Sequence, residues 1–349
     1  MTFSNDLLNW YDQNARILPW RTSPADRALG VLPDPYHVWL SEIMLQQTTV
    51  KAVAPYFTKF LQIWPNVTLL AEADGNAVMA AWAGLGYYSR ARNLKRCAEM
   101  IVRDFGGRFP VTRADLLTLP GIGDYTASAI ASIAYAEPVV VMDGNVERVS
   151  TRLLALETPL PTAKPTIRAF LEPVVPQTRP GDFAQAMMDL GATLCTPRSP
   201  SCIICPIASH CKARGNDPAR FPYKQAKTAK PNRKGAAFVV IRDDGAIWLQ
   251  RRPTKGLLGG MAQVPTTHWD SRKDGATGVD AAPFAGNWAH KGSIIHVFTH
   301  FSLQLQVYLS TVAQTTGEGW WSPDATIEAL PSLMVKVIQQ ALDKFESRL

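Results

Sequence analysis

Cysteine is scarce in this chain, and long hydrophobic runs are lacking altogether. Five of the 349 residues are cysteine, and no apolar stretch approaches the about 18–20 residues that a membrane-spanning helix needs. The opening residues, MTFSNDLLNWYDQ, lack the basic and then apolar segments of a secretory signal. We therefore expect a globular protein without a membrane partner that resides in the cytoplasm (with the nucleoid, if bacterial), where thiols stay reduced.

Acidic residues are outnumbered by basic ones. The chain has 36 Lys and Arg against 29 Asp and Glu, a net charge of +7, and residues 216–234 alone hold six basic residues and one acidic residue. A basic excess suits a polyanionic partner, because each phosphate contact releases counterions. It suits plain solubility equally well, so charge by itself leaves nucleic-acid binding open.

The hydrophobic pattern changes along the chain. Over residues 1–215 apolar residues recur three and four apart, as in the stretch 37–64, where we expect a helix interrupted near Pro55. Residues 216–234 predict an extended basic linker. Over 235–349, runs such as AAFVVIR and LQLQVYLS predict strands, followed by an amphipathic terminal helix. We therefore predict a multidomain protein, an all-α domain followed by an α+β domain.

Four of the five cysteines stand in one loop, residues 195–211, with the spacing C-x6-C-x2-C-x5-C. In a reducing compartment such a cluster indicates a metal centre rather than disulfides. A zinc ribbon separates its cysteine pairs by about 12 or more residues, which fits this loop poorly, and four thiolates also hold iron–sulfur clusters. Zinc stays open at this point. The four ligands are Cys195, Cys202, Cys205 and Cys211.

Two carboxylates occur in apolar surroundings. Glu42 is the single acid in VWLSEIMLQQT, so its neighbours should raise its pKa, although a solvated helix-face glutamate is the simpler reading. Asp143, in PVVVMDGNVERV, opens a helix and is either a plain N-cap or a functional carboxylate. Enzymes that cleave a glycosidic bond use two carboxyl groups, one that holds a proton and one that stays ionised, and two such groups could supply that pair here.

The stretch LTLPGIGDYTASAIASIAY, about residues 116–135, places Gly121 and Gly123 between two helical runs. The backbone N–H groups at the start of the second helix suit a phosphate, because helix N-termini carry positive partial charge. An ordinary corner between two helices is the alternative.

Together these motifs resemble the endonuclease III and MutY family of helix-hairpin-helix DNA glycosylases, strongly over 1–215 and more moderately over 235–349. The resemblance implies that the cysteines hold a structural 4Fe–4S cluster and that the hairpin grips DNA. SEIMLQQT and MDGNVERV are similar to the signatures of the MutY branch. By that match Glu42 protonates the departing purine and later helps to activate water. Asp143, supported by Asn145, stabilises the sugar cation.

The position after LPGIGD separates the branches of this family. Endonuclease III-type members carry there a lysine that attacks the sugar, whereas this chain has Tyr125. The resemblance therefore implies base removal without efficient strand cleavage, with the tyrosine near the catalytic aspartate. Glu147 stands where some MutY proteins have lysine, which weakens any expectation of covalent trapping on DNA.

The family extrudes its target base from the duplex. Gln47 and Tyr87 match the residues that intercalate into the DNA. The residues that match the lining of the adenine pocket are Trp20, Arg21, Leu45 and Gln185.

The second domain resembles the Nudix-like domain of MutY proteins but lacks the acidic box of a Nudix hydrolase. The resemblance implies that Phe298, Thr299 and His300, in a turn between strands, read 8-oxoguanine; a plain hairpin is the alternative. The expected activity is removal of adenine mispaired with 8-oxoguanine or guanine in double-stranded DNA, by a monomer. The alternatives are a bifunctional endonuclease III-type glycosylase/AP lyase and a non-catalytic iron–sulfur DNA-binding protein.

Overall fold

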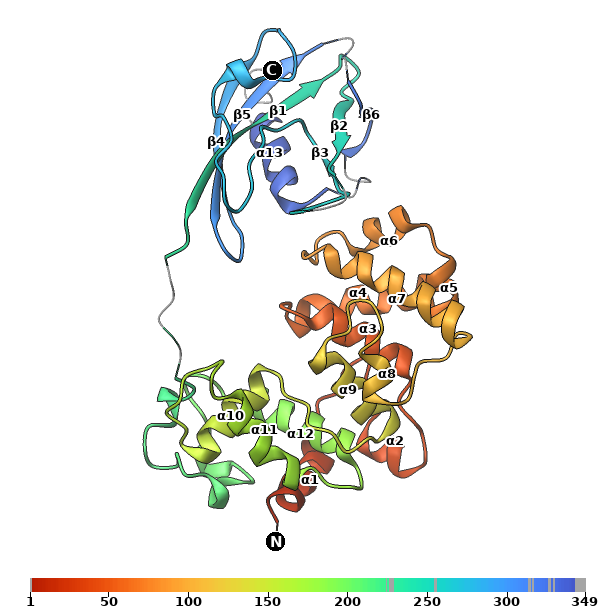
Figure 1. Cartoon of the computed structure of the whole chain (residues 1–349), viewed down its shortest axis with the longest axis vertical. Helices are drawn as coiled ribbons and strands as arrows, with labels where there is room; N and C mark the ends of the chain where they lie inside the picture. Colours follow the sequence, from red (N-terminus) through yellow and green to blue (C-terminus); the bar gives the residue numbers. More distant parts are fainter. Residues whose placement is uncertain are drawn as a thin grey trace. The chain divides into compact units, whose positions relative to one another are not determined.

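A computed structural model describes residues 2–223, 225, 229–253, 256–312, 315, 317–325, 328 and 330–342. Residues 224 and 226–228 of the expected basic linker lie outside the described residues. The chain divides into two compact units, Met1–Ala73 with Asn93–Ala226, and Asp74–Arg92 with Lys227–Leu349 (Figure 1). The domain boundaries at 215 and 235 stay predictions.

The first unit is helical. Helix α3 packs on α9, α9 on α12, and α12 on both α1 and α10 (Figure 1). Its helices are α1 (Phe3–Asn14), α2 (Pro24–Ala28), α3 (Pro35–Leu45), α4 (Val50–Ile63), α5 (Val67–Glu72), α8 (Arg113–Leu116), α9 (Asp124–Tyr135), α10 (Gly144–Leu154), α11 (Lys164–Leu171) and α12 (Pro180–Thr193), with 3-10 turns η1 (Glu172–Val174), η2 (Cys202–Ile204), η3 (Ala208–His210) and η4 (Pro218–Arg220). Helix α7 (Ser89–Phe105) begins in the second unit and ends in the first.

The predicted interruption near Pro55 is wrong. Pro55 lies inside α4, and the break falls between α3 and α4 instead, where Gln47 has a φ of 57°. Thr49 then caps α4, its hydroxyl accepting a hydrogen bond from the N–H of Ala52. A proline removes one helical hydrogen bond, and burial of the apolar face around Phe57 compensates for it.

Most helices of the first unit begin at a capping side chain. Asn66, for example, accepts from the N–H of Leu69 at 2.9 Å, and Asp143 accepts from the N–H of Val146 at 2.7 Å. Helix α9 differs, because its N-cap residue, Gly123, has no side chain to cap it. Its first N–H groups are therefore left for another acceptor.

The second unit is built on a six-stranded mixed sheet. The strand order is β3-β2-β1-β5-β4, with β6 paired to β2, and β1 runs parallel to β5 while the other pairs are antiparallel. The strands are β1 (Asn232–Ile241), β2 (Ile247–Arg251), β3 (Ala262–Gln263), β4 (Ala289–Val297), β5 (Ser302–Thr311) and β6 (Trp320–Ser322), accompanied by α6 (Gly75–Trp82), η5 (Val279–Ala281) and α13 (Ser332–Leu342).

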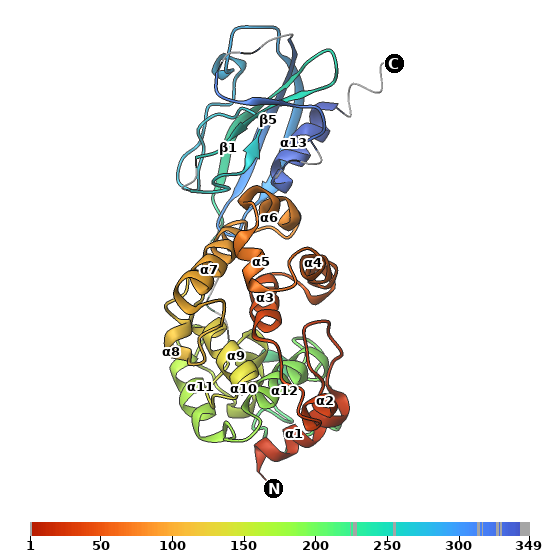
Figure 2. The ribbon, with the colours of Figure 1, turned by 90° about the vertical axis from the view of Figure 1, so that its right-hand side faces the viewer.

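Helix α13 packs against β4, β5 and β1 (Figure 2). Alternate residues of β5 point into the core between sheet and helix, where Leu303, Leu305 and Val307 are fully buried beside Val337. The predicted class, a helical domain followed by an α+β domain, is confirmed. Among the described residues, no helix combines the length and the apolar character needed to cross a membrane.

Candidate active site

A cleft of about 1320 Å³ opens in the first unit, between segments that lie far apart in the sequence. Small-molecule pockets usually measure about 300–1,000 Å³, so this cleft has room for an extruded nucleotide. Many of the predicted site residues line it together. They are Trp20, Arg21, Glu42, Leu45, Gln47, Gly121, Gly123, Tyr125, Asp143, Asn145 and Gln185.

Glu42 is a buried acid in this cleft, on α3, with 7% of its surface exposed. The pKa of its carboxyl is raised to about 7, chiefly by burial and in smaller part by the nearby charge of Asp143, while Tyr125 and Arg21 oppose the shift. A carboxyl with a pKa near neutrality is half protonated there, so it can give a proton and later accept one. The solvated helix-face reading of Glu42 is wrong.

Tyr125 lies on α9, one residue after the start of the helix. Its hydroxyl donates a hydrogen bond of 2.7 Å to Oε2 of Glu42. The resemblance led us to expect this tyrosine beside the aspartate, but the hydrogen bond that the structure shows runs to the glutamate. Burial raises the pKa of Tyr125 well above its ordinary value, so the phenol keeps its proton.

Asp143 stands at the start of α10, where it is the N-cap and also faces the cleft. Oδ1 accepts from the N–H of Val146 at 2.7 Å, and Oδ2 accepts from the side-chain amide of Asn145 at 2.8 Å. Arg148 in turn donates to Oδ1 of Asn145 at 2.9 Å and to the carbonyl oxygen of Cys195 at 2.9 Å. The capping role and a functional role are thus compatible, and a chain of hydrogen bonds ties the aspartate to the cysteine loop.

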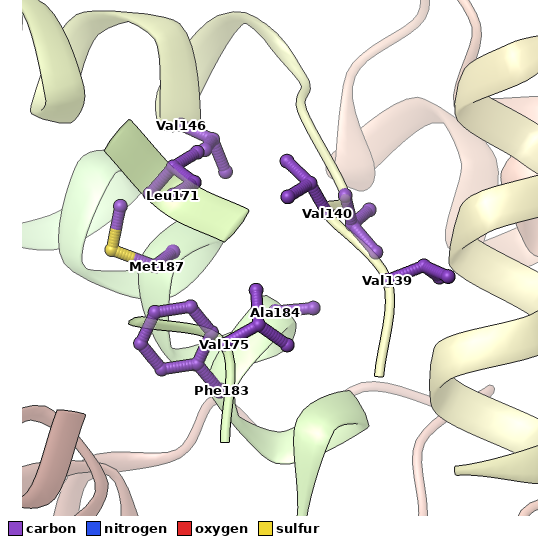
Figure 3. A pocket seen from close by; sticks show the side chains of 9 residues that line it. Val139, Val140, Val146, Leu171, Val175, Phe183, Ala184 and Met187 are labelled. Atoms are coloured by element: carbon purple, nitrogen blue, oxygen red, sulfur yellow. The ribbon is translucent and has the colours of Figure 1, made fainter. Parts of the chain in front are cut away.

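The run that leads into Asp143 is held by apolar packing. Val139, Val140 and Val141 line a cavity of about 10 Å³ together with Phe183 and other side chains of α10, α11 and α12. Figure 3 shows Val140 on one side of this cavity and Phe183 on the other. A water needs about 10–15 Å³, so this cavity is a small packing gap and leaves no room for a substrate. The packing fixes the backbone from which the carboxylate projects.

Sequence reasoning missed Asp189, a fully buried carboxylate on α12. It accepts from the guanidinium groups of Arg21 and Arg16, each at 2.6 Å. Asp189 thereby holds Arg21 at the wall of the cleft. Its place four residues after Gln185, on the same face of α12, is the signal that could have found it.

Lys164, the first residue of α11, was also missed. It lines the cleft and pairs with Glu147 on α10, with 2.8 Å between Nζ and Oε1. The chain thus carries a cation close to the position that lysine occupies in some MutY proteins, although it comes from another helix. No local pattern predicts this pairing, because the two residues meet only in the folded chain.

The hairpin places two glycines in the cleft for different reasons. Gly121 has a φ of 78°, and a Cβ there would come within 2.7 Å of the side chain of Asn93. Gly123 has an ordinary φ of −99°, and a Cβ there would meet open space. The tight turn therefore requires Gly121 only, whereas Gly123 leaves the start of α9 uncapped, as an anion site needs.

The four cysteines of residues 195–211 line one cavity, and none of them is in a disulfide. Arg152, with 1% of its surface exposed, donates to Sγ of Cys195 at 3.1 Å and to the carbonyl oxygen of Thr196 at 2.8 Å. Within the described part of the chain, no three His, Cys, Asp or Glu side chains lie close enough to hold a single ion. Four thiolates around a common cavity, beside a buried cation, fit an iron–sulfur cluster, in which each thiolate binds a different iron.

In the second unit, the predicted recognition residues form the turn between β4 and β5. The ring of Phe298 stacks on that of Phe301 at 4.7 Å, which anchors the turn, while Thr299 and His300 are exposed at its tip. The hydroxyl of Tyr87, a residue of the same unit, lies 3.1 Å from that of Thr299.

Gln47 and Tyr87, the two residues predicted to intercalate, share an unusual backbone conformation. Their φ angles are 57° and 49°, in the left-handed region that side-chain-bearing residues seldom adopt. Tyr87 is 44% exposed. Strained backbone persists where surrounding structure imposes it, and it concentrates at functional sites.

Comparison with known proteins agrees with this architecture. The chain matches the HhH-GPD superfamily of base excision DNA repair proteins over residues 40–176, the iron-sulfur binding domain of endonuclease III over 195–211, and the NUDIX domain over 236–340. The match over 195–211 confirms the predicted 4Fe–4S cluster.

The curated relatives include adenine DNA glycosylases from distant organisms. The protein of Homo sapiens is 36% identical, with 88% of this chain and 66% of that protein aligned, so the chain spans about two thirds of its length. That of Mus musculus is 37% identical over 88% of this chain and 70% of that protein. The protein of Buchnera aphidicola subsp. Schizaphis graminum is 33% identical, with 87% of this chain and 86% of that protein aligned.

Solved structures share the helical part. A thermostable thymine-DNA glycosylase superposes with a TM-score of 0.53 at 27% identity, covering 60% of this chain and 94% of that one. A non-covalent endonuclease III–DNA complex superposes with a TM-score of 0.50 at 20% identity, covering 61% of this chain and 96% of that one. This likeness shows the fold alone. The matched relatives are adenine DNA glycosylases, and the chain has the helix-hairpin-helix domain, the cysteine loop and the Nudix-like domain. The chain therefore belongs to the MutY family of adenine DNA glycosylases, enzymes of base excision repair.

Proposed function

We propose that this chain hydrolyses the N-glycosidic bond of adenine mispaired with 8-oxoguanine or guanine in duplex DNA, without efficient strand cleavage. The observation that carries the proposal is the buried acid Glu42, with a pKa of about 7, in a nucleotide-sized cleft that also holds Asp143. Such a pair supplies a proton donor and an anion to one reaction.

Protonated Glu42 gives its proton to the imidazole-ring nitrogen of the extruded adenine. The bond between the sugar C1′ and the purine nitrogen then breaks, and the bonding electrons leave with the base. Tyr125 orients the carboxyl through its 2.7 Å hydrogen bond. Once it has lost its proton, the Glu42 carboxylate accepts one from the water that attacks C1′.

Asp143 stabilises the positive charge that develops on the sugar. Asn145 fixes the orientation of the carboxylate, and Arg148 fixes that of Asn145. The 4Fe–4S cluster, held by the four cysteines, supplies structural order to the loop that accepts a hydrogen bond from Arg148. The uncapped start of α9 binds a DNA phosphate.

Strand cleavage needs an amine that attacks the sugar. Tyr125 stands where the lyase branch has lysine, and a phenol cannot form a Schiff base. Lys164 does line the cleft, but its ammonium group is paired with Glu147 at 2.8 Å. An amine engaged in an ion pair is a poor nucleophile, which supports a monofunctional enzyme.

The second unit reads the partner base. Thr299 and His300 offer a hydroxyl and an imidazole from an exposed turn, and Tyr87 presents a ring within the same unit. We propose that this group distinguishes 8-oxoguanine from guanine. We also propose that the protein acts as a monomer in the reducing cytoplasm, where cysteines stay available as cluster ligands.

An abasic-site assay tests the proposal. The labelled strand carries adenine opposite 8-oxoguanine, and the products are resolved with and without alkali after incubation with the wild type. We expect strand breaks after alkali treatment only. Glu42→Gln should reduce single-turnover excision by roughly a hundredfold or more, the usual contribution of a general acid, while Glu72→Gln, an exposed glutamate outside the cleft, should match the wild type.

The alternatives predict other results. Breaks without alkali would identify a bifunctional lyase, and replacing Lys164 by methionine would then test its amine. Binding without release of adenine would identify a non-catalytic DNA-binding protein. Near-normal excision by Glu42→Gln would refute the assigned proton donor.

A further inference from the structure

The last residues of the basic linker, which belong to the second unit, are hydrogen-bonded to the turn between β4 and β5. The ammonium group of Lys230 donates to the carbonyl oxygen of Phe298, with 3.1 Å between Nζ and O. The carbonyl oxygen of Pro231 accepts from the N–H of Ser302 at 3.0 Å. Oδ1 of Asn232 accepts from the hydroxyl of the same serine at 3.1 Å. Both ends of the turn are therefore held by the chain that leads into β1.

The register of the sheet accounts for these contacts. β1 and β5 are parallel neighbours from their first residues onward, with Asn232 opposite Ser302. The residues just before β1 therefore lie beside the residues just before β5, which are those of the turn. A lysine two residues before β1 can reach the backbone of the turn, although the two segments are far apart in the sequence.

The hydrogen bond from Lys230 acts on one particular peptide unit. The ring of Phe298 stacks on that of Phe301, and its N–H donates to the carbonyl oxygen of Phe301 at 2.8 Å. These contacts hold the side of Phe298 that precedes its carbonyl group. The carbonyl group shares one planar unit with the N–H of Thr299. By holding the carbonyl oxygen, Lys230 therefore fixes the direction in which the chain enters Thr299.

The tip of the turn needs such support for the task proposed for it. Thr299 and His300 are exposed, so burial of their side chains does not hold them in place. Guanine has an acceptor at N7, whereas 8-oxoguanine has an N–H donor there and a carbonyl oxygen on the next carbon. Groups that distinguish the two bases must keep hydrogen-bond geometry, because the interaction weakens steeply as the angle departs from linearity. A turn whose peptide units rotate freely would lose this distinction.

We propose that Lys230 is a positioning residue for the recognition of 8-oxoguanine, which holds the recognition turn through its hydrogen bond to the carbonyl oxygen of Phe298. The inference rests on the proposed function, because the turn must read the partner base. Lys230 acts through Thr299 and His300 in this role. A lysine that bound a DNA phosphate instead would add affinity for every duplex alike, together with a steeper salt dependence.

The test uses the full chain with its cluster and two substitutions of the same residue. Lys230→Met keeps most of the side chain and removes the donor, whereas Lys230→Arg keeps a donor. Lys273→Met, at an exposed lysine of the same unit, is the matched control. Dissociation constants are measured over a salt series for duplexes with 8-oxoguanine or guanine opposite a non-cleavable adenine analogue. Hydrogen exchange of the turn is measured in the proteins without DNA.

We expect Lys230→Met to reduce the preference for 8-oxoguanine about fivefold, the usual contribution of one hydrogen bond. The slope of log Kd against log salt should stay unchanged, and hydrogen exchange in the turn should become faster. Lys230→Arg and Lys273→Met should keep the wild-type preference. Added to Thr299→Ala with His300→Ala, Lys230→Met should change the preference no further, because the lysine acts through these two residues.

An unchanged preference in Lys230→Met, or unchanged hydrogen exchange in the turn, would overturn the proposal. So would equal weakening for both duplexes with a slope smaller by about one, which would identify a phosphate contact. If the wild type itself bound both duplexes equally, the proposed reading of 8-oxoguanine would fail, and the inference with it. Hydrogen exchange separates that case from a failure of the inference alone, because it reports the hold on the turn without any DNA.

Discussion

Replacing Tyr125 by phenylalanine removes one O–H group and leaves the ring that fills the wall of the cleft. That hydroxyl donates a 2.7 Å hydrogen bond to Glu42 and lowers the pKa of the carboxyl. Burial has the larger and opposite effect, and the resulting pKa is about 7. The hydrogen bond is stronger to the carboxylate than to the neutral acid. Without it, the pKa of Glu42 must rise.

The size of the rise follows from the hydrogen bond. A bond to a charged group contributes about 1.5–3 kcal/mol, and one pKa unit corresponds to about 1.4 kcal/mol. Because the protonated acid keeps part of the interaction, we expect a shift of about one unit. Excision requires protonated Glu42, so the rate falls as pH rises through its pKa. The alkaline limb of the profile should therefore move to higher pH.

The assay is single-turnover release of adenine, opposite 8-oxoguanine, between about pH 5 and 10. Tyr135→Phe is the matched control, because Tyr135 ends the same helix and donates instead to the carbonyl of Phe109 at 3.1 Å. Its profile should coincide with that of the wild type. An alkaline limb that stays in place in an active Tyr125→Phe enzyme, or that moves to lower pH, would refute the assignment of Glu42 as the proton donor.

Three further tests concern other parts of the structure. Gly121→Ala should weaken DNA binding and lower the melting temperature, because its Cβ would collide with the opposite side chain, whereas Gly123→Ala should leave the melting temperature nearly unchanged. Arg152→Gln should lower the iron content of the purified protein, because its guanidinium group holds the cysteine loop at three backbone carbonyls. Thr299→Ala with His300→Ala should abolish the preference for 8-oxoguanine over guanine opposite adenine, measured by binding.

Each of these three tests has a result that would contradict its prediction. A Gly121→Ala variant as stable as the wild type would show that the turn relaxes without cost. Full iron content in Arg152→Gln, equal to that of the exposed control Arg198→Gln, would remove the arginine from cluster retention. An unchanged preference in the double variant would leave the turn between β4 and β5 without a role in recognition.

Local sequence predicted the parts of this protein that depend on neighbouring residues. The cysteine spacing of residues 195–211 indicated a metal-binding loop. Ligands that are only a few residues apart in the sequence can meet with little help from the rest of the fold. Strands β1 and β5 and the terminal helix of the second unit followed from β-rich runs and a helical pattern. The isolated position of Glu42 in an apolar run indicated a raised pKa, which burial produces.

Tertiary structure decided what lies between distant segments. The hydrogen bond from Tyr125 to Glu42 joins α9 to α3, and the support of Arg21 by Asp189 joins the N-terminal loop to α12; both depend on how helices pack. The continuation of α4 through Pro55 likewise followed from buried contacts that outweigh a local preference. The sequence determines which side chains the protein has. The distances between those side chains and their burial arise only when helices that are far apart in the sequence pack into one core.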